Sequence, residues 1–119
     1  MREVRVRART PRGLTVLYLL RVKGDSMSPT LEEGHAVIGL SPRLIAVKPG
    51  RIIAFQRGAD LYIKRALTRE GDGWFVVGDN PARSTDSRRF GPVPQSAIRA
   101  VAVLGLAPLA FNLRRLLPI

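Results

Sequence analysis

A serine and a lysine are the residues of this chain best suited to chemistry. Ser26 lies in the run GDSMSPTL that begins at Gly24, and Lys64 follows 38 positions later. A serine hydroxyl is a weak nucleophile until a nearby base removes its proton, and enzymes use histidine or a neutral lysine for this purpose. The single histidine, His35, begins an apolar run and has no second histidine to share the task. The sequence therefore favours Lys64 as the base.

Lys64 can act as a base near neutral pH only if its pKa is lowered. An unperturbed lysine has a pKa of about 10.4, so the pKa must fall by roughly 3, a preference of about 4 kcal/mol for the neutral amine. Burial has this effect, and we expect Ile63, Leu67 and a neighbouring Phe55 to remove water from the amine. A carboxylate would oppose it, so we expect none close to the amine.

Short apolar runs separated by glycine and proline predict a protein built from β-strands. A buried strand is expected to deliver the chain to Ser26, followed by a turn at Ser28–Pro29. Lys64 should share one face of its strand with Tyr62 and Ala66. The pattern predicts an all-β sandwich or irregular β-barrel, with strands over 14–22, 35–40, 51–55, 61–67, 74–77 and 98–104.

The length of 119 residues fits one domain. Residues 1–119 are expected to form a single domain with a core over about 16–105. A basic amino-terminal strand is expected over 1–12, and an apolar and basic segment with a short helix over 106–119. The absence of cysteine excludes disulfides and thiolate metal sites, and one histidine argues against a zinc centre. We therefore expect no metal and no cofactor.

The net charge of +11 raises the question of nucleic acid or anionic lipid as a partner. Arginines at positions 5, 7 and 9 alternate with apolar residues, but no aromatic residues lie between them as single-strand binding would require. We expect no nucleic-acid partner. No apolar run reaches 18 residues, and the amino terminus lacks the apolar core of a secretory signal. The sequence thus predicts a soluble, cytoplasmic protein. Its shorter apolar runs allow at most peripheral contact with a membrane. The oligomeric state is not predicted.

Three segments, taken together, resemble the type I signal peptidase family of serine proteases. They occur in the order and at the spacing of that family, and the resemblance covers about 22–94. GDSMSPTL at 24–31 is similar to the nucleophile box and YIKR at 62–65 to the lysine box, while GDN at 78–80, STDSR at 84–88 and Gly91 are similar to the third box. The resemblance implies a coiled, irregular β-barrel as the catalytic core.

The resemblance also implies a role for each matching residue. Ser26 would attack the scissile carbonyl with Lys64 as general base, and Ser84 would hydrogen-bond the lysine amine. Asp86 and Arg88 would support the site. Because a carboxylate facing the amine would hold its charge, we expect Asp86 to be turned aside and paired with Arg88 in a charge-assisted hydrogen bond.

The same resemblance suggests how substrate would be bound. Met27 would lie near the pocket for the small side chain that precedes the cut, and Pro29 is a second candidate for substrate contact. The backbone N–H of Ser26 would contribute to an oxyanion hole. Gly24 stands where some members of the family place a serine as the second donor, so that donor is not assigned.

The expected function is therefore that of a Ser/Lys endopeptidase. It would remove an amino-terminal leader or signal extension from a precursor protein bound in extended form. Within the family, the chain is similar to the small peptidases that mature nickel-type superoxide dismutase. Two alternatives stay open: a self-cleaving protease like the repressor and mutagenesis-protein relatives, and a non-catalytic basic module that binds through its +11 charge.

Overall fold

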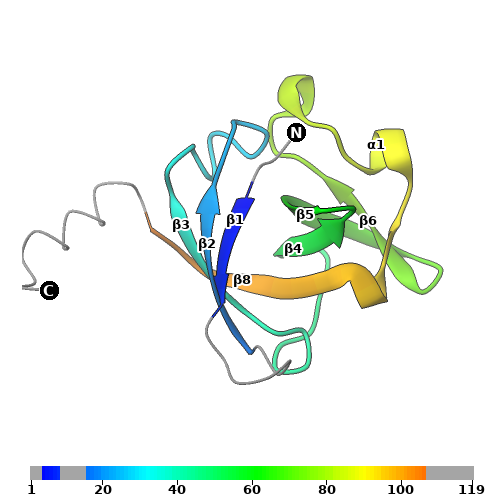
Figure 1. Ribbon diagram of the computed structural model, residues 1–119. Helices are drawn as coiled ribbons and strands as arrows, with labels where there is room; N and C mark the ends of the chain where they lie inside the picture. Colours follow the sequence, from blue (N-terminus) through cyan, green and yellow to red (C-terminus); the bar gives the residue numbers. More distant parts are fainter. Residues whose placement is uncertain (1–3, 9–15, 107–119) are drawn as a thin grey trace, which may run out of the picture.

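The computed structural model describes residues 4–8 and 16–106, and nearly all of its regular structure is β-strand (Figure 1). The strands are β1 (Val4–Ala8), β2 (Leu17–Val22), β3 (Ala36–Leu40), β4 (Ile52–Arg57), β5 (Asp60–Glu70), β6 (Gly73–Val77), β7 (Val93–Pro94) and β8 (Ile98–Leu106). Between them lie one short helix, α1 (Ser87–Phe90), and two 3₁₀ helices, η1 (Pro81–Arg83) and η2 (Gln95–Ala97). The all-β prediction is confirmed.

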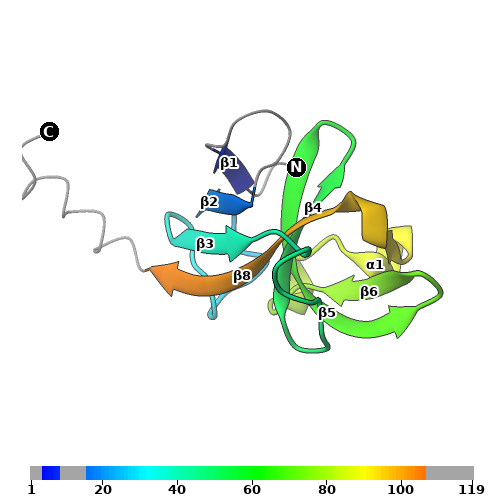
Figure 2. The same cartoon turned by 90° about the horizontal axis from the view of Figure 1, so that it is seen from below.

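The strands form one antiparallel sheet that coils back toward its first strand. Their order is β1-β2-β3-β8-β4-β5-β6-β7, and β1 also pairs with β5 through Val4 and Leu61. The long strand β8 joins the two halves of the sheet, because it pairs with β3 at one end and with β4 at the other (Figure 2). This coiled sheet agrees with the irregular barrel that the resemblance implied.

The central strands are buried on both faces, so two core clusters lie on opposite sides of them. Successive side chains on a strand point to opposite faces, which places Ile63 in the first cluster and Tyr62 in the second. The first cluster contains Leu20, Val22, Met27, Leu31, Val37, Ala54, Ile63 and Ala100. The second contains Ile53, Phe55, Tyr62, Ala66, Trp74, Val76, Val93, Ile98 and Val101.

Two details of the sequence prediction were wrong. The strand expected over 14–22 is described from position 16, is regular over Leu17–Val22, and is buried on one face only: Leu20 and Val22 lie in the core, whereas Leu17 and Leu19 are exposed. Leu67 was expected to shield the lysine amine but is 50% exposed. The pairing of β5 with β6 shifts register between Ala66 and Thr68, so Leu67 lies at a bulge that turns it to solvent.

The ends of the chain are described only in part. The predicted amino-terminal strand is present as Val4–Ala8, while 1–3, 9–15 and 107–119, including the predicted carboxyl-terminal helix, lie outside the described residues. Within 4–8 and 16–106, no helix has the length and apolar character needed to cross a membrane.

Candidate active site

The serine and lysine singled out from the sequence are in contact. Ser26 lies in the turn after β2, and Lys64 lies in the middle of β5. Lys64 Nζ and Ser26 Oγ are 2.9 Å apart, within hydrogen-bond distance. Both residues are buried, with exposed fractions of 4% for Ser26 and 0% for Lys64. The fold thus brings together, away from solvent, two groups that are far apart in the sequence.

The turn that carries Ser26 is held by its own backbone and by the core. The N–H of Ser28 donates to the carbonyl of Asp25 at 3.1 Å, and the N–H of Leu31 donates to the carbonyl of Met27 at 2.9 Å. The side chains of Met27 and Leu31 are both buried in the first core cluster. Ser26 is therefore fixed at the start of a turn whose following residues are anchored in the interior, as the predicted turn at 28–29 required.

Apolar and aromatic side chains lie next to Lys64. On β4, its cross-strand neighbour is Ile53, which is fully buried, and Phe55 lies farther along the same strand. The ring of Tyr62 lies 5.6 Å from Lys64 Nζ. Lysine is among the residues least often fully buried, since moving an ammonium group out of water is costly. Burial of this kind favours the neutral amine.

The segment after β6 is tied to the Ser26 turn at several atoms. The N–H of Asn80 donates to the carbonyl of Ser26 at 2.8 Å, and its side-chain amide donates to the carbonyl of Asp25 at 3.0 Å. The N–H of Asp79 contacts Met27 Sδ at 3.4 Å. Sequence reasoning placed Asp79 and Asn80 in the third box but gave them no role. Their observed role is to hold the turn that presents Ser26.

Arg65 fixes the same segment to β5. It follows Lys64 on the strand and so points to the opposite face, where Nε and Nη2 donate to the two carboxylate oxygens of Asp79 at 2.8 and 2.6 Å. Nη1 donates to the carbonyl of Gly50 at 2.6 Å. The hydrogen bonds from Arg65 lower the pKa of Asp79. This bidentate ion pair between Arg65 and Asp79 was not predicted. The sequence indicated it only by the presence of an arginine in the lysine box and an aspartate in the third box.

Hydrogen bonds join Ser84 and Arg88 to Asp86, and Asp86 to the start of this segment at Gly78. Asp86 is buried and accepts hydrogen bonds from Ser84 Oγ at 2.8 Å and from the N–H of Gly78 at 2.8 Å. Arg88 donates to it through Nε at 2.9 Å and Nη2 at 2.7 Å, so the expected pair is present. Burial by itself would raise the pKa of Asp86, but the hydrogen bonds from Arg88, Gly78 and Ser84 outweigh it and hold the pKa well below its ordinary value.

This lowered pKa predicts that acid weakens the fold through Asp86. In the unfolded chain the carboxyl group takes up a proton near pH 3.9, whereas in the folded protein it resists protonation. The stabilisation is therefore present above about pH 4 and is lost as the pH falls through the lower folded value. We expect Asp86→Asn to cost about 1–3 kcal/mol at pH 7 and to flatten the decline of stability below about pH 4.

Urea unfolding between neutral and strongly acidic pH measures both effects. The control is Asp72→Asn in the exposed hairpin loop, which should keep the wild-type pH dependence. Parallel pH curves for the wild type and Asp86→Asn would contradict the prediction.

The two candidates for substrate contact lie in different environments. Met27 is 1% exposed and belongs to the first core cluster, whereas Pro29 is exposed in the turn. Their part in substrate binding stays a prediction.

Comparison with known proteins gives two findings. Residues 2–103 match the profile described as "Peptidase S24-like". The chain is also 31% identical over 121 aligned residues to the mitochondrial ATP-independent inner membrane protease subunit 1a of Arabidopsis thaliana, with 78% of this chain and 72% of that protein covered. The matched range includes Ser26, Lys64 and the whole group from Gly78 to Arg88.

Proposed function

This chain belongs to the S24-like, signal peptidase-like family of peptidases, and on that premise we propose that it is a serine endopeptidase in which Lys64 activates Ser26. The observation that carries the proposal is the 2.9 Å contact between Lys64 Nζ and Ser26 Oγ at a site where both residues are buried. His35, the single histidine, is engaged elsewhere: its Nδ1 accepts from the N–H of Glu32 at the end of the turn.

The proposed chemistry follows from this contact. The neutral amine of Lys64 takes the proton of Ser26 Oγ as the oxygen bonds to the substrate carbonyl carbon. The same proton then passes to the leaving amine as the peptide bond breaks, which leaves an ester on Ser26. Water attacks this ester with Lys64 again as base, and the serine is restored. The backbone N–H of Ser26 is proposed to stabilise the oxyanion.

The remaining site residues are proposed to position the pair. The family resemblance assigns to Ser84 a hydrogen bond to the amine of Lys64, and the contacts of Ser84 support a fixed orientation. Its hydroxyl donates to Asp86, which is held in turn by Arg88. Asp86 and Arg88 would thus act through Ser84 and not on the substrate. Met27 remains the proposed neighbour of the substrate side chain before the cut.

We further propose that the substrate is a precursor protein from which an amino-terminal leader is removed. The relative found in Arabidopsis is named as a subunit of an inner membrane protease, which supports a protein substrate. An extended peptide can be bound through backbone hydrogen bonds to a strand edge. For the location, the cytoplasm with peripheral membrane contact stays the proposal, and the closer likeness to peptidases of nickel-type superoxide dismutase stays a prediction.

The amino termini of cellular proteins test this function. In cells that make the protein, replacing wild type with Ser26→Ala should cause at least one precursor to accumulate with its leader attached, since the nucleophile is gone. Mass spectrometry of protein amino termini would identify it.

The matched control is Ser28→Ala, which removes a hydroxyl of the same turn that donates to Glu32 at 3.0 Å. This variant should process precursors as the wild type does. Identical sets of amino termini in wild-type and Ser26→Ala cells would contradict the proposal.

A further inference from the structure

A groove with a volume of about 370 Å³ lies where β8 separates from β4. The pairing of β8 with β4 ends at Val101 and Ile53, whereas its pairing with β3 continues to the end of β8 (Figure 2). The two stretches that separate, 50–52 and 102–105, both line the groove. The serine and the lysine of the candidate active site do not line it, so the groove is a separate site.

The side chains that line the groove are mainly aliphatic. Leu31 and Val37 belong to the first core cluster, and Ile52 and Ala102 pack against that cluster. Leu104, which is about half exposed, also lines the groove. An apolar chain placed here would leave water for contact with these side chains, which is favourable.

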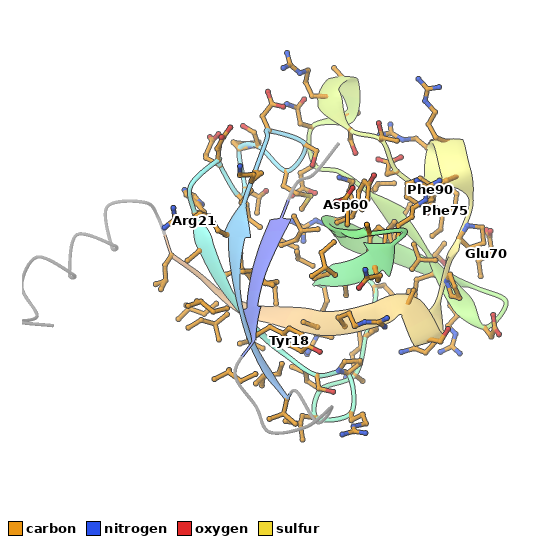
Figure 3. All side chains as sticks on the ribbon, viewed as in Figure 1. Tyr18, Arg21, Asp60, Glu70, Phe75 and Phe90 are labelled. Atoms are coloured by element: carbon orange, nitrogen blue, oxygen red, sulfur yellow. The ribbon has the colours of Figure 1, made fainter. Side chains whose placement is uncertain are left out.

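Among the described residues that line the groove, none is aromatic. Phe75 and Phe90 lie at the opposite end of the molecule from the end of β8 that borders the groove (Figure 3). Nucleobases and other flat rings are commonly bound by stacking on aromatic side chains. The lining therefore favours a flexible aliphatic ligand over a nucleotide or an aromatic compound.

The groove also contains a guanidinium group that has no partner among the described residues. Arg65 lines the groove, but its guanidinium is engaged by Asp79 and by the carbonyl of Gly50. Arg51 is half-buried, and no ion pair or side-chain hydrogen bond among the described residues includes it. No carboxylate lines the groove, so Arg51 gives it a positive charge that an anion would neutralise.

The volume of the groove indicates the size of the ligand. At about 30 Å³ for each water-sized group, the groove has room for roughly twelve non-hydrogen atoms. A saturated carboxylate of about ten carbons has this size. Its anionic head and aliphatic chain match the two kinds of group that line the groove.

We propose that the groove binds an aliphatic carboxylate of the size of a medium-chain fatty acid. The two carboxylate oxygens accept hydrogen bonds from the guanidinium of Arg51, in the bidentate geometry that suits this pair. The chain lies against Leu31, Val37 and Ile52. The site does not depend on the proposed peptidase function, because it uses neither the serine nor the lysine.

Titration of the protein with decanoate tests the proposal. The probe is kept below the concentration at which it forms micelles, and backbone amide shifts are followed by NMR. We expect saturable shifts at 50–52 and 102–105. Decanol, which has the same chain without the charge, should bind at least about tenfold more weakly, since the charge-assisted hydrogen bonds are lost.

Variants of the groove separate the two parts of the ligand. Arg51→Gln should weaken decanoate binding at least about tenfold and leave decanol binding unchanged, whereas Arg51→Lys should retain part of the preference for decanoate. Ala102→Leu should weaken the binding of both probes, because the larger side chain occupies the groove. Arg43→Gln is the matched control: it removes the same charge from an exposed loop position and should bind as the wild type does.

Four results would overturn the proposal: no saturable shifts at the groove, equal binding of decanoate and decanol, equal binding by wild type and Arg51→Gln, or tighter binding of a blocked valine–glutamate–valine tripeptide than of decanoate. The last result would assign the groove to a peptide. If Arg51→Gln did not fold, the comparison of decanoate with decanol on the wild type would still decide. The proposed peptidase function stands in each case.

Discussion

Lys64→Met is expected to abolish cleavage while the protein stays folded. Methionine keeps most of the volume of the lysine side chain but has no amine, so Ser26 keeps its proton. We expect kcat/KM to fall by at least about 10³-fold, as for loss of a catalytic base. Stability should change by less than about 1.5 kcal/mol, because the site is buried and methionine suits an apolar interior.

Two assays on the same samples measure the two effects: cleavage of a peptide library prepared from a digested proteome, with new amino termini counted by mass spectrometry, and unfolding in urea. Lys48→Met is the matched control, since Lys48 lies exposed in the loop before β4, and it should retain activity and stability. If Lys64→Met cut at the wild-type rate, the base would have been assigned to the wrong residue. If it failed to fold, the apolar surroundings described for the amine would be in error.

Gly78→Ala is expected to lower activity by displacing residues of the site, without removing any of their functional groups. A Cβ at this position would meet the side chain of Ser84 on one side and lie 2.7 Å from the carbonyl oxygen of Ser26 on the other. The N–H of Gly78 also donates to Asp86, so the backbone is not free to retreat. We expect a loss of about 1–3 kcal/mol in stability, typical of overpacking. Displacement of Ser26 should lower kcat roughly 100-fold.

Gly105→Ala is the control that shows whether the loss of activity is specific to the candidate active site. There a Cβ would lie 3.2 Å from Cδ2 of Leu31, so that side chain would have to shift by only a few tenths of an ångström. Both variants would be assayed for library cleavage and thermal unfolding, and Gly105→Ala should remain close to wild type. Normal activity of Gly78→Ala would mean that the contact between Gly78, Ser84 and Ser26 does not position the nucleophile.

Strands were predictable where the residues of the strand and its flanking turns carried the whole pattern. The apolar run at 35–40 became β3, and Gly71, with a positive φ of 62°, closes the hairpin expected between β5 and β6. β5 continues to Glu70, beyond the end of its apolar pattern, because pairing with β6 extends it. The two-residue strand β7 has no local signal, since it exists only through its pairing with Gly73 and Trp74.

The site was predictable in its residue types and not in its contacts. Ser26 and Lys64 stand out because a serine in a proline-containing turn and a lysine on an apolar strand form a recognisable combination with the third box. Their meeting across 38 positions depends on the coil of the whole sheet, which no local pattern encodes. The hydrogen bond from Asn80 to the carbonyl of Ser26 involves backbone atoms, and these are the same for nearly any residue type.

The opposite orientations of Lys64 and Arg65 on β5 make this protein sensitive to a misaligned strand. Side chains alternate along a strand, so a slip of one position would turn the guanidinium of Arg65 toward the serine and the amine toward Asp79. A guanidinium cannot give up its proton in a protein. Under the proposed mechanism, a molecule misfolded in this way would keep most of its strand content and yet be inactive. The fraction of active molecules after refolding would then measure how often β5 pairs in the correct register.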